Sequence, residues 1–149
     1  MKVDDDVEQF VRDTLHFAVK QQPAEFDQSL SRVSGERERQ AALELLVAIS
    51  LYVAIDICGE RPSAQQVREL AVRVADAESW SSATPDDVEK FLTTALAGGR
   101  LIDELPANTV VVLAFVIAAS LLASKPKAEG EWWFNYLDKV EAAIEVAGR

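Results

Sequence analysis

The chain has very few of the residues on which most recognisable chemistry depends, with one histidine and one cysteine among its 149 residues. The single cysteine, Cys58, excludes an intramolecular disulfide and a cysteine-based zinc cluster. A single histidine excludes paired-histidine zinc sites, and the sequence has neither a glycine-rich nucleotide-binding loop nor a G-x-S-x-G turn. Catalysis by two carboxylates stays open, because an acidic chain contains many such pairs. We therefore expect no metal and no cofactor, and a non-catalytic protein ahead of an enzyme.

Basic residues are also scarce, since 15 lysines and arginines stand against 25 aspartates and glutamates, for a net charge of −10. The negative charge is spread along the chain, and no segment is basic. Binding to nucleic acid depends on Lys and Arg displacing counterions from the phosphates, so we expect no nucleic-acid partner. An acidic surface suits a basic protein partner.

Glycine and proline number only six and five, too few for long flexible segments. The apolar residues of every long segment recur at intervals of three or four, which predicts helices. The expected helices run from residue 3 to before Pro23 and over about 24–33, 36–58, 84–97, 109–124 and 131–147, with another starting at a Ser63–Gln66 capping box and a short turn at 100–105. We therefore predict an all-α protein, one domain over residues 1–149, built as a bundle of six or seven helices.

Two of these helices are apolar enough to form the centre of the bundle, near residues 43–57 and 109–124. The second follows Asn108, a residue type that commonly caps helix N-termini. Its strictly apolar part, 110–123, is shorter than the roughly 20 residues that a membrane span usually needs, so membrane insertion is not expected. The acidic start of the chain lacks the pattern of a secretion signal, and we expect a cytoplasmic protein.

One stretch is similar to part of a known family. Residues 51–75, LYVAIDICGERPSAQQVRELAVRVA, loosely resemble the helical dimerisation domain of the acidic ribosomal stalk proteins. The alanine-rich hinge and the acidic tail expected of that family are absent from this chain. The sequence is therefore assigned to no family.

Two titratable residues are candidates for a site inside the bundle. Asp56 interrupts the apolar stretch YVAIDICG, and a buried carboxylate is costly without a partner. The favoured interpretation is structural: Asp56 lies at the helix edge or pairs with an arginine such as Arg61. A catalytic or metal-binding role is the alternative. His16 follows Asp13 by three residues, but a lone Asp-x-x-His lacks the further ligands of a metal-binding bundle. A small-molecule pocket or enzyme site between the long helices would be lined by His16, Tyr52, Asp56 and Trp133.

The segment EGEWWFNYL, residues 129–137, contains two of the three tryptophans. On a helical projection, one face carries a core stripe formed by Trp133, Tyr136, Leu137, Val140, Ile144 and Ala147. Trp132 and Phe134 fall on opposite sides of this stripe; Phe134 is predicted to be exposed, and Trp132 is either exposed or covered at the edge of the bundle. Aromatic residues dominate protein interfaces. The leading hypothesis is a non-catalytic acidic helical protein, either a regulatory adaptor or an inhibitor of the immunity type, that binds a protein partner or a second copy of itself through Trp132 and Phe134.

Overall fold

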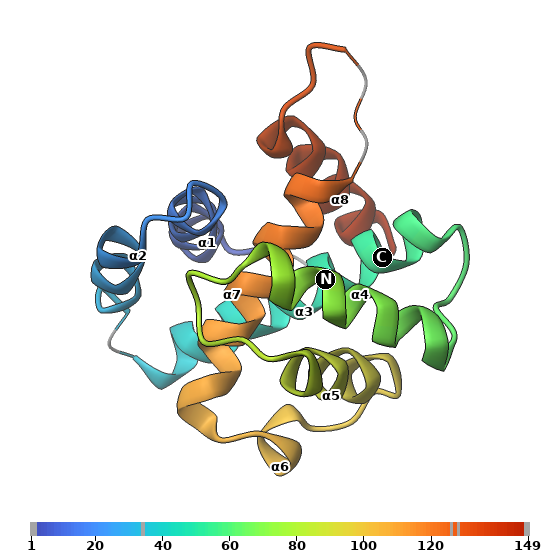
Figure 1. Ribbon diagram of the computed structural model, residues 1–149. Coiled ribbons are helices and arrows are strands. Elements are labelled where there is room, and N and C mark those ends of the chain that lie inside the picture. Colours follow the sequence, from blue (N-terminus) through green and yellow to red (C-terminus); the bar gives the residue numbers. More distant parts are fainter. Residues whose placement is uncertain (1–2, 34, 126, 128, 148–149) are drawn as a thin grey trace.

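The computed structural model describes residues 3–33, 35–125, 127 and 129–147, and these residues form eight α-helices and no strand. The helices are α1 (Asp5–Val19), α2 (Pro23–Leu30), α3 (Glu36–Cys58), α4 (Ala64–Ala77), α5 (Pro85–Leu96), α6 (Leu101–Glu104), α7 (Ala107–Ser124) and α8 (Trp133–Ala147) (Figure 1). The all-α prediction is confirmed. The count exceeds the six or seven expected because the turn predicted at 100–105 contains the four-residue helix α6.

Helix α7 lies at the centre of the fold and contacts α1, α3, α4, α5, α6 and α8. It has no charged residue over its whole length, and it is buried continuously from Leu113 to Leu122. The long helix α3 packs along it, so the two most apolar helices lie side by side in the middle of the molecule. One hydrophobic cluster of buried residues draws on all eight helices. Helix α8 lies toward the upper end of the molecule in Figure 1, and α6 lies at the lower end.

Aromatic rings connect the N-terminal helices to this centre. Phe115 on α7 makes edge-to-face contacts with Phe10 on α1 and Phe26 on α2, at centroid distances of 5.8 and 5.9 Å. Phe26 also meets Trp80, in the link between α4 and α5, at 5.5 Å. Edge-to-face pairs of this kind add stability beyond the area that they bury. The rings therefore hold α1, α2 and the α4–α5 link against α7.

Side-chain caps at Asp4, Ser63 and Thr84 mark the starts of α1, α4 and α5. The side chain of Ser63 accepts from the backbone N–H of Gln66, and the Gln66 side chain accepts from the backbone N–H of Ser63, so the predicted capping box of α4 is confirmed. The expected cap at Asn108 is wrong, because α7 starts at Ala107 after Pro106 and Asn108 lies inside its first turn. Pro106 is itself extended, with φ −58° and ψ 140°, and it precedes the first helical residue without a side-chain cap.

Two helices, α3 and α7, are long and apolar enough to cross a membrane by length and composition alone. The most apolar 18-residue window of α7 is 61% buried within the protein, which fits the central helix of a helical core. The corresponding window of α3 is only 39% buried. Many apolar residues of α3 are therefore only partly buried, and two of its large apolar side chains, Tyr52 and Ile55, are exposed.

Candidate functional site

Trp132 occupies the N-cap position of α8. Its carbonyl oxygen accepts the N–H of Tyr136 at 3.1 Å, and its own N–H donates to Oδ1 of Asn135 at 2.9 Å. These bonds are the pattern of a helix N-terminus in which the N3 side chain reaches back to the cap. The backbone at Trp132 is thus held in place, while its side chain is 65% exposed.

The spacing of apolar residues along α8 divides its side chains as the helical projection predicted. Tyr136, Leu137, Val140 and Ile144 are buried, and Trp133 is partly buried against the core. Phe134 is 42% exposed, and its ring packs edge-to-face on Trp133 at 5.9 Å. Ala147, which the projection placed on the core stripe, is exposed at the end of the helix. Trp132 and Phe134, the two rings outside the core stripe, are therefore both exposed.

Helix α3 carries a second exposed apolar face that the sequence analysis missed. No charged residue occurs between residues 45 and 55, and the core-facing side chains account for only part of this circumference. Tyr52 and Ile55 are each 40% exposed, and Leu51 beside them is partly buried. In the sequence, this face is indicated by the lack of any charge over three helical turns, because a helix with one buried face normally has a polar opposite face.

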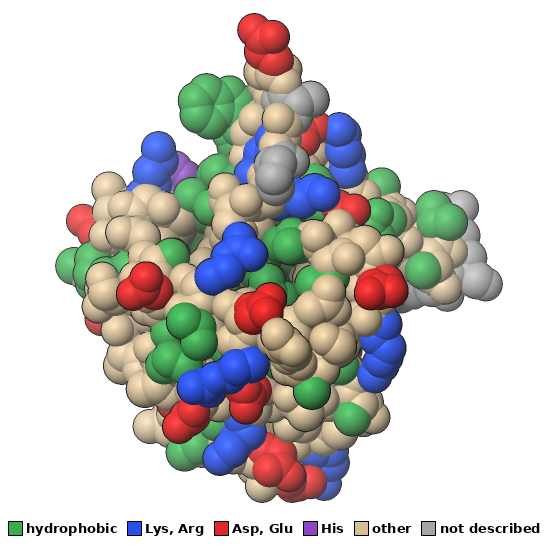
Figure 2. Space-filling model, turned by 45° about the vertical axis from the view of Figure 1, so that its right-hand side comes forward, with side chains coloured by type: hydrophobic (Ala, Val, Ile, Leu, Met, Phe, Trp, Pro, Cys, Tyr) green, Lys and Arg blue, Asp and Glu red, His purple; other side chains and the backbone are tan. Residues whose placement is uncertain are grey.

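These features gather on neighbouring helices. Among the residues that the structure describes, seven large hydrophobic side chains are exposed, and five of them belong to α8, its N-cap and α3. Helices α3 and α8 pack against each other. We call these five residues, Tyr52, Ile55, Trp132, Phe134 and Val146, the α3–α8 surface; within it Trp132 and Phe134 flank the core stripe of α8 on opposite sides. In Figure 2 a large hydrophobic side chain projects at the top of the molecule, beside the loop that leads into α8.

A polar cluster joins α3 to α8 beside this surface. The hydroxyl of the buried Tyr136 donates to Oδ2 of Asp56 at 2.5 Å, and Nζ of Lys125 lies 3.4 Å from the same oxygen. The Tyr136 hydrogen bond, followed by the charge of Lys125, lowers the pKa of Asp56. Burial, followed by the bond to Asp56, raises the pKa of Tyr136. Asp56 is thus a partnered carboxylate at the helix edge.

Of the two structural roles considered for Asp56, pairing with Arg61 is wrong, and Asp56 lies at the helix edge. Arg61 donates instead to the carbonyl oxygen of Leu96 at 2.6 Å, which ties the end of α3 to the end of α5. The left-handed Gly59 ends α3 and turns the chain away from Asp56, and Lys125 reaches Asp56 from the end of α7. The spacing of residues on α3 could not predict Lys125 as the partner, because Lys125 lies far along the sequence from Asp56.

The four candidate pocket residues do not all meet. Tyr52 lies near enough to Tyr136 to influence its titration, and so shares the neighbourhood of Asp56. His16 is exposed on α1, where its ring meets Phe17 at 5.5 Å. Four surface hollows have volumes of about 660, 480, 330 and 320 Å³. They lie between α5 and α6, between the starts of α1 and α3, between α3 and α5–α6, and between α4 and α7, and none of these four is lined by His16, Tyr52, Asp56 or Trp133.

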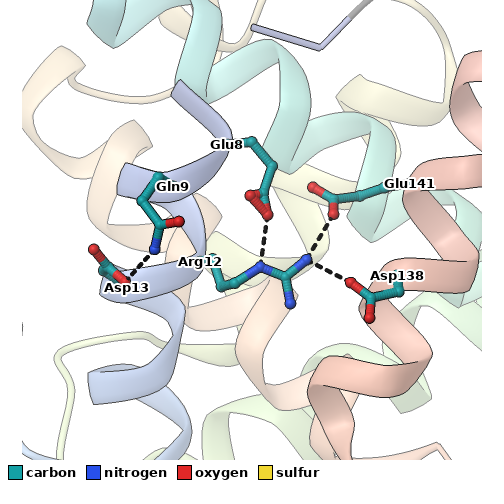
Figure 3. Close-up of polar contacts among 6 residues, drawn as sticks. All are labelled: Glu8, Gln9, Arg12, Asp13, Asp138 and Glu141. Carbon is teal, nitrogen blue, oxygen red and sulfur yellow. Dashed lines mark hydrogen bonds and ion pairs between the residues drawn. The ribbon is translucent and has the colours of Figure 1, made fainter. Parts of the chain in front are cut away.

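A second charged cluster links α1 to the other flank of α8 (Figure 3). Arg12 contacts Glu8 through Nε at 2.6 Å, and through one terminal nitrogen it contacts Asp138 at 2.7 Å and Glu141 at 3.0 Å. Burial, with the nearby charge of Glu8, raises the pKa of Glu141 to about 7. The sequence did not reveal this cluster, because Arg12 lies more than 120 positions from Asp138 and Glu141.

Within the described part of the chain, no group of three or more His, Cys, Asp or Glu side chains has the arrangement of a metal site. The three carboxylates around Arg12 are bound to a fixed cation instead. Comparisons with family models, with curated proteins and with solved structures each found no match. The site must therefore be interpreted from its own chemistry.

Proposed function

We propose that this chain is a non-catalytic protein-binding module whose contact surface is the α3–α8 surface. The observation that supports the proposal is the concentration of exposed apolar side chains on two adjacent helices, five of the seven among the described residues. Scattered apolar side chains are normal on protein surfaces, whereas concentrated ones usually mark a contact site. The proposed partner is another protein, with a regulatory adaptor or an inhibitor as the functional class.

The chemistry of the surface suits this role. Trp132 and Phe134 offer large rings on a backbone that the helix N-terminus already orders, so binding costs little additional conformational entropy there. Ion pairs occur on the same two helices and in the segments that lead into α8: Lys139 pairs with Glu131, and Lys125 pairs with Asp56. Protein interfaces commonly combine apolar side chains with charged residues at their rim.

The net charge of −10 adds a long-range preference for a basic partner. Charges of this kind act mainly on the rate of association, and salt weakens their effect. We therefore expect the association rate with an isolated partner to fall as ionic strength rises. A rate that is independent of salt would contradict the preference for a basic partner.

Site-specific photo-crosslinking in the cells that make this protein tests the proposal. A photoreactive phenylalanine analogue at position 134 should form a crosslink to one dominant protein, and the same analogue at position 102 should not. Ile102 is the matched control, because its side chain is 52% exposed on α6 at the opposite end of the molecule. Equal crosslinking from both positions, or none from position 134, would refute the proposed surface.

Self-association is a separate outcome of the same proposal. Sedimentation of the wild-type protein, of a Trp132→Ala/Phe134→Ala variant and of Ile102→Ala distinguishes a second copy from a different partner. A wild-type dimer that only the double variant dissociates identifies the partner as another copy. A wild-type monomer, together with a crosslinked protein of different mass, identifies a distinct partner.

A further inference from the structure

Three carboxylates meet one guanidinium between α1 and α8. Arg12 is contacted by Glu8 from its own helix and by Asp138 and Glu141 from α8 (Figure 3). With all three carboxylates ionised, the cluster has two negative charges in excess. The surroundings of the three acids differ, because the side chain of Asp138 is 62% exposed and that of Glu141 only 13%.

Among the three carboxylates, Glu141 is the least exposed, so water stabilises its charge least. Its Oε1 accepts from Arg12, but its Oε2 is buried and has no hydrogen-bond partner. An ionised carboxylate needs donors on both oxygens, and a buried oxygen without one is destabilising. A proton on Glu141 removes one of the excess charges and neutralises the group that lacks a donor.

The groups that face Glu141 come from α1 and α8. Glu8 and Arg12 approach it from α1, and Asp138 lies one turn away on its own helix. Helix α7, which also packs on α8, has no titratable side chain. The α3 carboxylate that contacts α8, Asp56, is bound to Tyr136 and Lys125. No second cation among these residues therefore balances the excess of acid around Arg12.

We propose that Glu8, Arg12, Asp138 and Glu141 form a proton-responsive latch that holds α8 against α1 when Glu141 is protonated and loosens when it ionises. In the loosened state α8 is held by α3 and α7 without the contact to α1, so it opens more often. The proposal does not depend on the binding function of the α3–α8 surface, because it concerns only the docking of α8 within this chain.

The direction of the pH effect follows from linkage. Glu141 has an ordinary pKa near 4.5, and burial raises it to about 7 in the docked helix. The docked state therefore binds more protons than the open state between these values, and docking weakens as the pH rises from about 4.5 through 7. A shift of this size corresponds to a change of about 10- to 100-fold in the opening equilibrium between pH 5 and pH 8.

Hydrogen exchange on the intact protein, corrected for the intrinsic dependence of exchange on pH, measures this opening. The α8 amides should open about 10- to 100-fold more often at pH 8 than at pH 5, and the amides of α5 should change much less. In a Glu141→Gln variant, which mimics the protonated side chain, the α8 amides should remain protected across this range. Glu145→Gln, one turn further along α8, is the matched control and should behave as the wild type.

Two results would overturn the latch. One is a wild-type α8 that opens with the same pH profile as Glu141→Gln. The other is a direct NMR titration of the Glu141 carboxyl that gives a pKa near 4.5 in the folded wild-type protein. The titration decides the question even if the glutamine substitution itself disturbs the docking of α8.

Discussion

The hydroxyl of Tyr136 donates a 2.5 Å hydrogen bond to Oδ2 of Asp56 and so joins the first turn of α8 to the last turn of α3. The donor is buried, with 6% of Tyr136 exposed, whereas the side chain of Asp56 is 42% exposed. The phenol ring thus belongs to the core, and its hydroxyl reaches the surface. This bond adds to the buried stripe of Leu137, Val140 and Ile144, which determines the face that α8 turns toward the core.

Replacing Tyr136 by Phe tests this link. The ring and its packing remain, and the loss of the hydrogen bond should lower the free energy of unfolding by about 1 kcal/mol. This is less than the roughly 1.5–3 kcal/mol of bonds to charged groups, because water can reach Asp56. Urea denaturation at pH 7 measures the change. Tyr52→Phe is the control, since the hydroxyl of the exposed Tyr52 makes no side-chain hydrogen bond among the described residues. A Tyr136→Phe protein as stable as the wild type would contradict the role of the bond.

The same variant should alter the response to acid. The pKa of Asp56 is depressed, first by Tyr136 and then by Lys125, so its contribution to stability is present above the ordinary pKa of 3.8 and is lost as the pH falls through the lower folded value. Removing the hydroxyl should move the pKa of Asp56 back up toward 3.8. An NMR titration of the Asp56 carboxyl in both proteins checks the direction; a pKa that stays unchanged or falls would contradict it.

The sequence was sufficient for features that depend on periodicity along one helix. The stripe of Tyr136, Leu137, Val140 and Ile144 follows from helical geometry, and so does the position of Phe134 outside it. Helix boundaries set by local hydrogen bonds, such as the capping box at Ser63, could also be predicted. These features need no knowledge of which helices become neighbours.

Features that depend on neighbours could not be predicted. The pairing of Arg12 with Asp138 and Glu141 requires α1 and α8 to meet at a particular register, and charge patterns alone do not specify it. The exposed face of α3 also depends on the packing of helices, but there the feature is the lack of a covering helix. An apolar helix near the middle of a chain is usually a buried core helix, and only the packing reveals that no helix covers Tyr52 and Ile55 completely.

The two capping residues considered from the sequence should differ in their effect on stability. Ser63→Ala removes a cap that the structure contains and should cost about 1 kcal/mol in the free energy of unfolding. Asn108→Ala should cost nothing measurable, because Asn108 lies inside the first turn of α7 and α7 has no side-chain cap. Thermal or urea unfolding of both variants compares them directly. A larger loss for Asn108→Ala than for Ser63→Ala would contradict this assignment of the helix starts.

Removing the cation of the α1–α8 cluster should destabilise the protein. Arg12→Met keeps much of the apolar stem but leaves three carboxylates without a counter-charge, which should cost about 2 kcal/mol, less than for a fully buried pair because Asp138 is exposed. The loss should increase above pH 7, where Glu141 is ionised. Arg68→Met is the matched control, because Arg68 pairs with Asp86 and Glu89 at the exposed surface of α4 and α5. Urea unfolding at pH 6 and pH 8 measures both variants, and equal losses for the two would contradict a special role of the cluster.

The largest expected difference in the free energy of unfolding is between alanine substitutions of a buried and of an exposed phenylalanine. Phe115 is fully buried and meets the rings of both Phe10 and Phe26, so Phe115→Ala should cost about 3–5 kcal/mol through lost burial and the cavity left behind. Phe134→Ala should cost less than about 1 kcal/mol, because 42% of Phe134 is already exposed and, among the described residues, its ring pairs with Trp133 alone.

Urea unfolding of the two alanine variants measures the difference, and the slope of the unfolding free energy with urea checks that each still unfolds in one transition. If Phe115→Ala does not fold, Phe115→Leu supplies a milder change in the same direction. A loss for Phe134→Ala as large as that for Phe115 would mean that Phe134 stabilises the fold. Its exposed ring would then be explained by the stability of α8, and the case for the α3–α8 surface as a binding site would lose one of its two aromatic anchors.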